Sequence, residues 1–198
     1  YANHPRGGEV QLEAQIWPHG SVWDGGILNG YAEAWDRPES GDSVRLHGTF
    51  RGARHFSYDF DKQRFALSDP LYWTSAQGQL AVGGALSPNE GEVLRVQARN
   101  VDIPFWSRVA GLADLELGGS VALDAIVVGQ LSGWAVSGGL RTDSLRLKNQ
   151  SLGELNLDLD YVPERDVADL VLNWDLRDTA IVHLKGSLSS AGFSAKTQ

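Results

Sequence analysis

Acidic side chains are the first residues whose spacing could support catalysis in this sequence. Asp59 with Asp61, and Asp158 with Asp160, each place two carboxylates two residues apart, and a glycosidase requires only two carboxylates. Each pair lies on the polar side of a segment in which apolar and polar residues alternate, which is where solvated acids are expected. We interpret both pairs as surface acids, and a catalytic or calcium-binding role remains the alternative.

The histidines form no catalytic or metal-binding pattern. The sequence contains no G-x-S-x-G, H-x-H or H-E-x-x-H motif and no cysteine, so a nucleophile elbow, these metal motifs and thiolate chemistry are absent. The loop at Asp24-Gly25-Gly26 lacks the ligand series of an EF-hand. The sequence therefore predicts no enzyme, no metal site and no cofactor. The histidines are scattered as His4, His19, His47, His55 and His183.

Seven tryptophans are the second group with possible binding chemistry. Trp17, Trp23 and Trp35 are close enough in sequence to sit on neighbouring strands, and a flat row of exposed indoles would stack on sugar rings. This gives one hypothesis, a carbohydrate-binding β-sandwich that uses surface tryptophans. Tryptophan also fills cores and sits at apolar–water boundaries, and Trp174 follows the apolar phase of its segment. A purely structural module is a third possibility.

The composition describes a folded protein that does not bind nucleic acid. Of 198 residues, 42% are hydrophobic and 21% are charged, with a formal net charge of −8. An acidic chain without a basic face is poorly suited to phosphate backbones. The chain begins at Tyr1 and contains no methionine, so we interpret residues 1–198 as a single segment excised from a longer protein.

Period-2 alternation of apolar and polar residues dominates the sequence and predicts β-strands. Apolar residues recur at every second position in 10–16, 44–50, 56–60, 155–161 and 170–176, with turn residues between these segments. The segments are short and closely spaced, which favours antiparallel meanders. The predicted class is all-β, with one short helix over 103–111, for which a buried loop is the alternative.

A weak internal repeat, apolar-x-Gly-x-apolar, occurs five times. We expect its central glycine to lie within a strand and to point inward each time, where a missing side chain lets a sheet bend into a trough. Five β-bulges in an ordinary sandwich are the alternative. The central glycines are Gly48, Gly84, Gly119, Gly138 and Gly186.

The repeat texture resembles that of a known family. Residues 115–147 carry a G-x-L-x-G-like stretch followed by V-x-G-x-L, residues 152–161 carry short L-x-L strands ending in Tyr161, and residues 184–188 repeat the glycine unit. This pattern is similar to the AsmA/TamB-like envelope proteins of Gram-negative bacteria. The resemblance is clearest over residues 78–188.

The resemblance implies a long antiparallel amphipathic sheet curled into a U-shaped, taco-like groove. It further implies a periplasmic segment of a parent anchored in the inner membrane, with phospholipid acyl chains and outer-membrane assembly proteins as partners. The expected activity is passive lipid transport and outer-membrane biogenesis without catalysis. The residues expected to line the groove are Leu80, Val82, Leu86, Leu117, Val121, Leu123, Leu145, Leu147, Leu155, Leu157, Leu159, Leu170 and Leu172.

Overall fold

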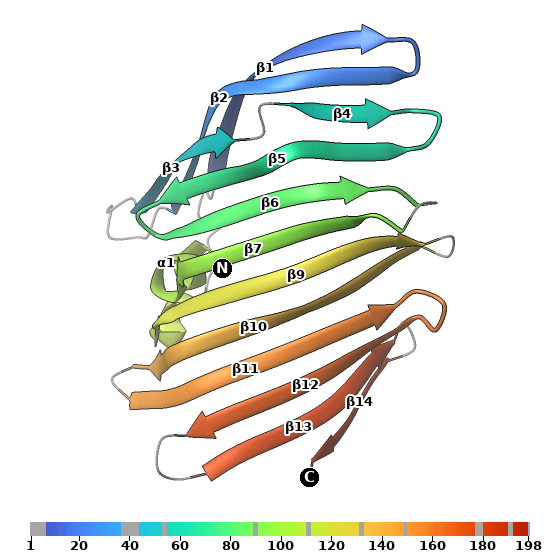
Figure 1. The fold of residues 1–198 in the computed structure, drawn as a ribbon. Helices are drawn as coiled ribbons and strands as arrows, with labels where there is room; N and C mark the ends of the chain where they lie inside the picture. Colours follow the sequence, from blue (N-terminus) through green and yellow to red (C-terminus); the bar gives the residue numbers. More distant parts are fainter. Residues whose placement is uncertain are drawn as a thin grey trace.

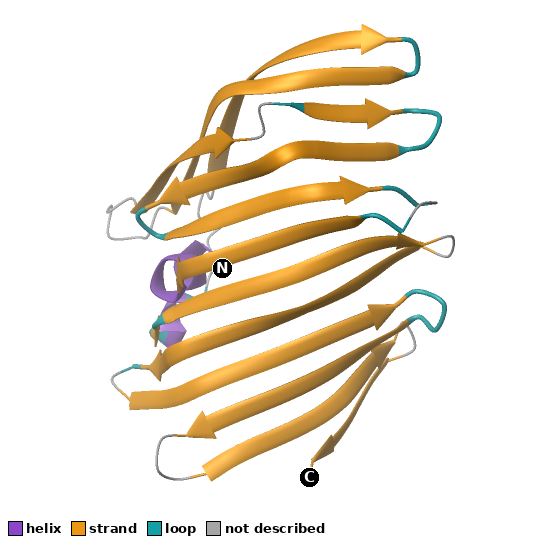
Figure 2. Cartoon of the chain, in the orientation of Figure 1, coloured by secondary structure: helices purple, strands orange, loops and turns teal. Residues whose placement is uncertain are grey.

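A computed structural model gives the fold of the chain (Figure 1). The structure describes residues 7–36, 44–52, 55–88, 91–109, 112–130, 133–148, 150–176, 180–189 and 192–197. In this part of the chain almost every residue outside the turns belongs to a strand, and the helical residues gather beside one end of the central strands (Figure 2).

The strands follow one another with short connections, apart from one helical insertion. The elements are β1 (Gly7–His19), β2 (Val22–Asp36), β3 (Val44–Gly52), β4 (Phe56–Asp59), β5 (Arg64–Ser75), β6 (Gly78–Leu86), β7 (Val93–Asp102), α1 (Ile103–Val109), the 3-10 helix η1 (Ala113–Leu115), β8 (Leu117–Gly118), β9 (Ser120–Gln130), β10 (Gly133–Leu147), β11 (Gln150–Val162), β12 (Val167–Leu176), β13 (Ala180–Ser189) and β14 (Gly192–Thr197).

All of these strands belong to one antiparallel sheet. Its order is β1-β2-β3-β5-β6-β7-β9-β10-β11-β12-β13-β14, with the short strand β4 pairing with β2 and β5, and β8 pairing with β10. Each long strand therefore lies beside its neighbours in sequence, as a meander requires. The sheet does not close on itself, so β1 and β14 are its two edges.

The insertion between β7 and β9 is a capped helix. The backbone N–H of Phe105 donates to Oδ2 of Asp102 at 3.0 Å, so the Asp102 carboxylate caps the helix N-terminus. Phe105 is 2% exposed and is the largest fully buried side chain in the described part of the chain. Neither α1 nor η1 has the length or hydrophobicity of a membrane span.

The position of α1 shows that the sheet is curled. Helix α1 follows β7 directly and contacts β7 and β8, but it also contacts β2. Three strands separate β2 from β7 in the sheet, so a flat sheet would hold these two strands about 19 Å apart. The contact therefore requires the β1–β2 end of the sheet to bend back toward the helix, as Figure 1 shows.

No described element forms a second layer across the sheet, and the surface area of the chain reflects this. The chain exposes 12828 Å² to solvent, whereas a compact monomer of 21.5 kDa would expose about 9,200 Å². Among the described residues, the buried apolar side chains are Ala98, Phe105 and Ala168. Most apolar side chains of the sheet are therefore only half-buried.

The predicted all-β class and curled antiparallel sheet are confirmed. The short helix expected over 103–111 is present as α1, and residues 110–111 lie outside the described part. The prediction that Gly119 lies within a strand is wrong, because this residue separates β8 from β9 with φ +110. The β-sandwich alternative requires two packed sheets, and this is not observed, because the described strands form a single sheet.

Phe105 should be a main anchor of the curl, because its ring is the one large side chain among the described residues that is almost fully removed from water. We expect Phe105→Ala to lower the free energy of unfolding by about 3–5 kcal/mol, measured by urea denaturation. The matched control is the next residue, Trp106, which is 38% exposed. Equal losses for Phe105→Ala and Trp106→Ala would contradict this role.

Candidate functional site

The two faces of the sheet differ in chemistry, most clearly on β5 and β7. Strand pairing places directly opposed residues on the same face, so a face can be followed from strand to strand. The face that carries Leu80, Leu123 and Leu157 is called the apolar face, and the opposite one the polar face. On β5 and β7, apolar-face residues are mostly half-buried while their polar-face neighbours are mostly exposed.

An unbroken row of apolar side chains crosses the middle of the apolar face. It takes one residue from each of nine strands, β3 to β13, and spans roughly 38 Å at the usual strand spacing. None of its members is charged, and each is directly paired with the next. The row is Phe50–Trp73–Leu80–Ala98–Leu123–Leu140–Leu157–Leu172–Leu184.

Two parallel rows continue the apolar face on the side away from α1. Aliphatic residues and glycines dominate both rows, and neither contains a charged residue. They are Leu71–Val82–Val96–Ala125–Gly138–Leu159–Leu170–Gly186 and Leu67–Gly84–Leu94–Val127–Val136–Tyr161–Ala168–Leu188. With no second layer, we infer that the apolar face lines the inside of the curl, where neighbouring side chains crowd together and shield one another.

Ten of the thirteen residues predicted to line a groove lie on the apolar face. They are Leu80, Val82, Leu86, Val121, Leu123, Leu155, Leu157, Leu159, Leu170 and Leu172. The other three, Leu117, Leu145 and Leu147, lie beyond the last regular pair of β10, where register shifts interrupt the rows. Leu117 and Leu147 pair with each other there. Whether any of these residues contacts a lipid remains a prediction.

The predicted groove residues leave out several apolar-face residues, including five of the central row: Phe50, Trp73, Ala98, Leu140 and Leu184. Leu140 follows two glycines, Trp73 lies in a segment with no clear alternation, and Leu184 stands in a glycine unit. Leu140 is the last apolar position of one glycine repeat unit and Leu184 is the first of another. The repeat could therefore have predicted that both residues lie on the apolar face. The pairing of strands was needed to place Trp73.

Two glycines on the apolar face are covered by aromatic rings from the neighbouring strand. A side chain at Gly48 would collide with the indole of Trp73, and one at Gly25 would collide with the ring of Phe56. Gly25 and Phe56 are directly paired. This arrangement, in which an aromatic ring packs over a strand glycine, pins strand register and compensates for the missing side chain.

Aromatic side chains gather where β2 begins and β4 ends, away from α1. Trp23 and Phe60 contact edge to face with ring centroids 5.1 Å apart, and Tyr58 and Phe60 do so at 4.7 Å. Trp23 is 43% exposed and Phe60 is 49% exposed. Half-exposed aromatic rings suit a boundary between an apolar surface and water.

Two of the tryptophans expected to form a sugar-binding row, Trp17 and Trp23, lie on opposite faces of the sheet. Trp17 pairs with Asp24 and Trp23 pairs with Pro18, so the two indoles lie on opposite faces of the β1–β2 ladder. The Trp35 side chain lies outside the described residues. Trp73, Trp134 and Trp174 are on the apolar face. Carbohydrate binding through tryptophan remains a prediction.

The acid pairs have separate surroundings. Oδ1 of Asp59 accepts from the backbone N–H groups of Asp61 and Lys62 at 3.0 and 3.2 Å, which fixes the turn between β4 and β5. Asp158 and Asp160 are exposed on the polar face. His19, His55 and His183 are exposed at separate places. His4 and the side chain of His47 lie outside the described residues.

Comparisons with protein-family models, curated proteins and solved structures found no match to this chain.

The packing of Trp73 over Gly48 predicts the effect of adding one methyl group. We expect Gly48→Ala to lower the free energy of unfolding by about 1–3 kcal/mol, because the indole must move out of its place in the central row. Gly118→Ala is the matched control, since a Cβ there would meet Arg146 side-chain atoms only at 3.4 Å or more. Thermal unfolding followed by tryptophan fluorescence would measure both, and equal stability of the two variants would contradict the packing argument.

Proposed function

We propose that the apolar face of the curled sheet binds the acyl chains of phospholipids and serves as a passive path for them. The observation that supports this most directly is the central row, which is apolar over nine strands. Its length of roughly 38 Å exceeds the thickness of a bilayer's hydrocarbon core, about 30 Å. Two acyl chains end to end fit along it.

The energetic reason is the lack of a covering layer. Exposing apolar surface costs about 25 cal/mol per Å², and large contiguous apolar patches on a protein surface mark sites of interaction. An acyl chain covers such a surface without requiring hydrogen-bond partners, and in the three rows only the Trp73 indole and the Tyr161 hydroxyl carry side-chain hydrogen-bonding groups. No step of this function involves bond making or breaking.

The wider biological setting is part of the same proposal. A sheet that carries lipid between membranes has to stand in the space between them, so we place this chain in the periplasm of a Gram-negative bacterium, as a segment of an AsmA/TamB-like protein anchored in the inner membrane. Its partners there would be envelope or outer-membrane assembly proteins. The repeat texture of residues 78–188 supports this setting.

Charge placed on the apolar face should abolish lipid binding, whereas the same charge on the polar face should not. We expect the double variant V121D/L157D to lose the phospholipid that co-purifies with the unaltered chain, measured by native mass spectrometry after organic extraction. The control A122D/N156D adds the same two negative charges to the same two strands, one residue away on the polar face. Equal retention of lipid by both variants would contradict the proposal.

A measurement on the unaltered chain keeps the test independent of variant folding. Trp73 and Trp174 lie on the apolar face, so a phospholipid with brominated acyl chains should quench their fluorescence. The variant W73F/W134F/W174F, which removes the three indoles placed on the apolar face, should lose much of that quenching. Absence of quenching in the unaltered chain would count against acyl-chain binding.

A further inference from the structure

The polar face carries a second feature that the apolar face does not explain, a pair of adjoining hollows. One hollow of about 360 Å³ extends from β7 to β11, and a second of about 270 Å³ extends from β5 to β7. Gln97 and Arg99 line both, so the hollows join into one trench roughly 24 Å long across six strands. We call it the polar trench.

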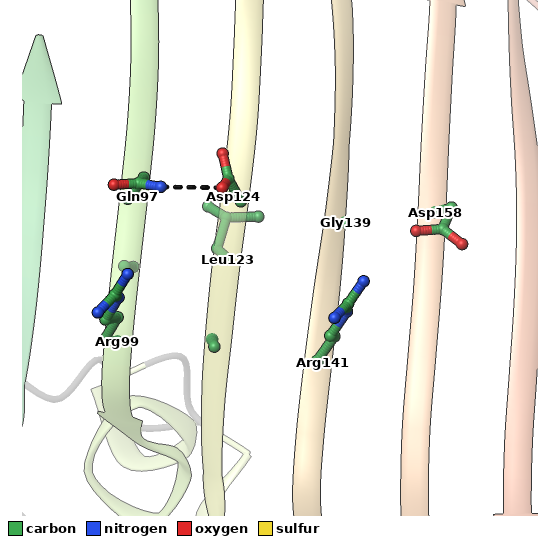
Figure 3. Close-up of a pocket in the computed structure, with 9 residues that line it drawn as sticks. Gln97, Arg99, Leu123, Asp124, Gly139, Arg141 and Asp158 are labelled. Carbon is green, nitrogen blue, oxygen red and sulfur yellow. Dashed lines mark hydrogen bonds between the residues drawn. The ribbon is translucent and has the colours of Figure 1, made fainter.

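The floor of the trench exists because two strands lack large side chains there. Ala122 of β9 is paired with Arg141 of β10, and Gly139 of β10 is paired with both Asp124 and Asp158. A side chain at Gly139 would meet Oδ1 of Asp158 at 2.9 Å, so only glycine leaves this part of the floor open. Figure 3 shows Arg99 and Arg141 on either side of β9.

The charged side chains in the trench differ in whether they have a partner. Asp124 is already occupied, since Nε2 of Gln97 donates to its Oδ2 at 2.9 Å and Nε of Arg95 lies 3.7 Å from its Oδ1. Arg99 and Arg141 make no ion pair with a described residue and are exposed. Two guanidinium groups with free donors form a site for an anion, and their planar fork matches a carboxylate.

The rest of the lining is suited to hydroxyl groups and to a flat ring. Gln79 and Gln97 offer amide donors and acceptors, and Asp158 offers carboxylate acceptors. Tyr72 stands at the β5 end of the trench with 49% of its surface exposed. An exposed aromatic ring beside planar polar side chains can stack on the apolar face of a sugar ring while its neighbours bind the hydroxyls.

We propose that the polar trench binds an acidic oligosaccharide, with Arg99 and Arg141 holding a uronate carboxylate and Tyr72 stacking on a sugar ring. The site is independent of lipid binding, because adjacent side chains on a strand point to opposite faces and a lipid on the apolar face cannot reach it. It also differs from the tryptophan hypothesis, since no tryptophan other than Trp73 lines either hollow and that indole lies on the apolar face.

The test is a titration of the unaltered chain with trigalacturonate, monitored by isothermal calorimetry and by amide chemical shifts. We expect saturable binding with shifts confined to β5–β11, and at least about tenfold weaker binding of the neutral trisaccharide maltotriose, since a lost charge-assisted pair costs about that factor. Equal binding of maltotriose, no binding of trigalacturonate, or equally strong competition by inorganic phosphate would each overturn the proposal.

Variants separate the trench from general surface charge. R141A and Y72A should each weaken trigalacturonate binding about tenfold, while R146A, which removes an exposed arginine of the same strand outside both hollows, should leave it unchanged. G139V fills the floor without altering any charge and should also weaken binding. If R146A weakens binding as much as R141A does, the ligand is responding to net charge and the site is refuted.

Discussion

An apolar sheet face with no covering layer is the constraint on which the rest of this structure depends. Every described strand contributes to one sheet, and the described helical elements lie beside one end of its central strands. The apolar face can therefore be removed from water in two ways: the sheet can curl, or a ligand can cover the face. The contact of α1 with β2 shows that the chain uses the first way.

Curling alone leaves much of the apolar face half-buried, as the large total surface and the small number of buried apolar residues show. This remaining exposure is costly in a chain that otherwise satisfies its polar backbone groups through the sheet. A function that covers the face with acyl chains would remove the cost, and it explains why the paired rows exclude charge. The same exposure is a liability at the open edges β1 and β14, where unpaired backbone groups favour further strand pairing.

The two faces of the sheet present different side chains because alternation separates neighbouring residues. Leu123 and Asp124 are neighbours in sequence, yet Leu123 continues the apolar row and Asp124 borders the polar trench. Small residues work in opposite ways on the two faces. On the apolar face, Gly25 and Gly48 are filled by aromatic rings from adjacent strands, whereas on the polar face Ala122 and Gly139 leave space open.

The sequence by itself determined the class of fold and most of the apolar face, because alternation acts over a few residues. It predicted the short helix with a buried loop as the alternative, and the structure decided between them. It placed Leu80, Leu123 and Leu157 on a common face correctly and misplaced Gly119. It also expected Leu117, Leu145 and Leu147 to line the groove, but it gave no sign of the register shifts of β10 that interrupt the rows there. Only the tertiary structure decided the continuous central row, the return of β2 to α1, and the meeting of Arg99, Ala122 and Arg141. These features depend on register between strands and on the bend of the whole sheet, which the local pattern of a single strand does not encode.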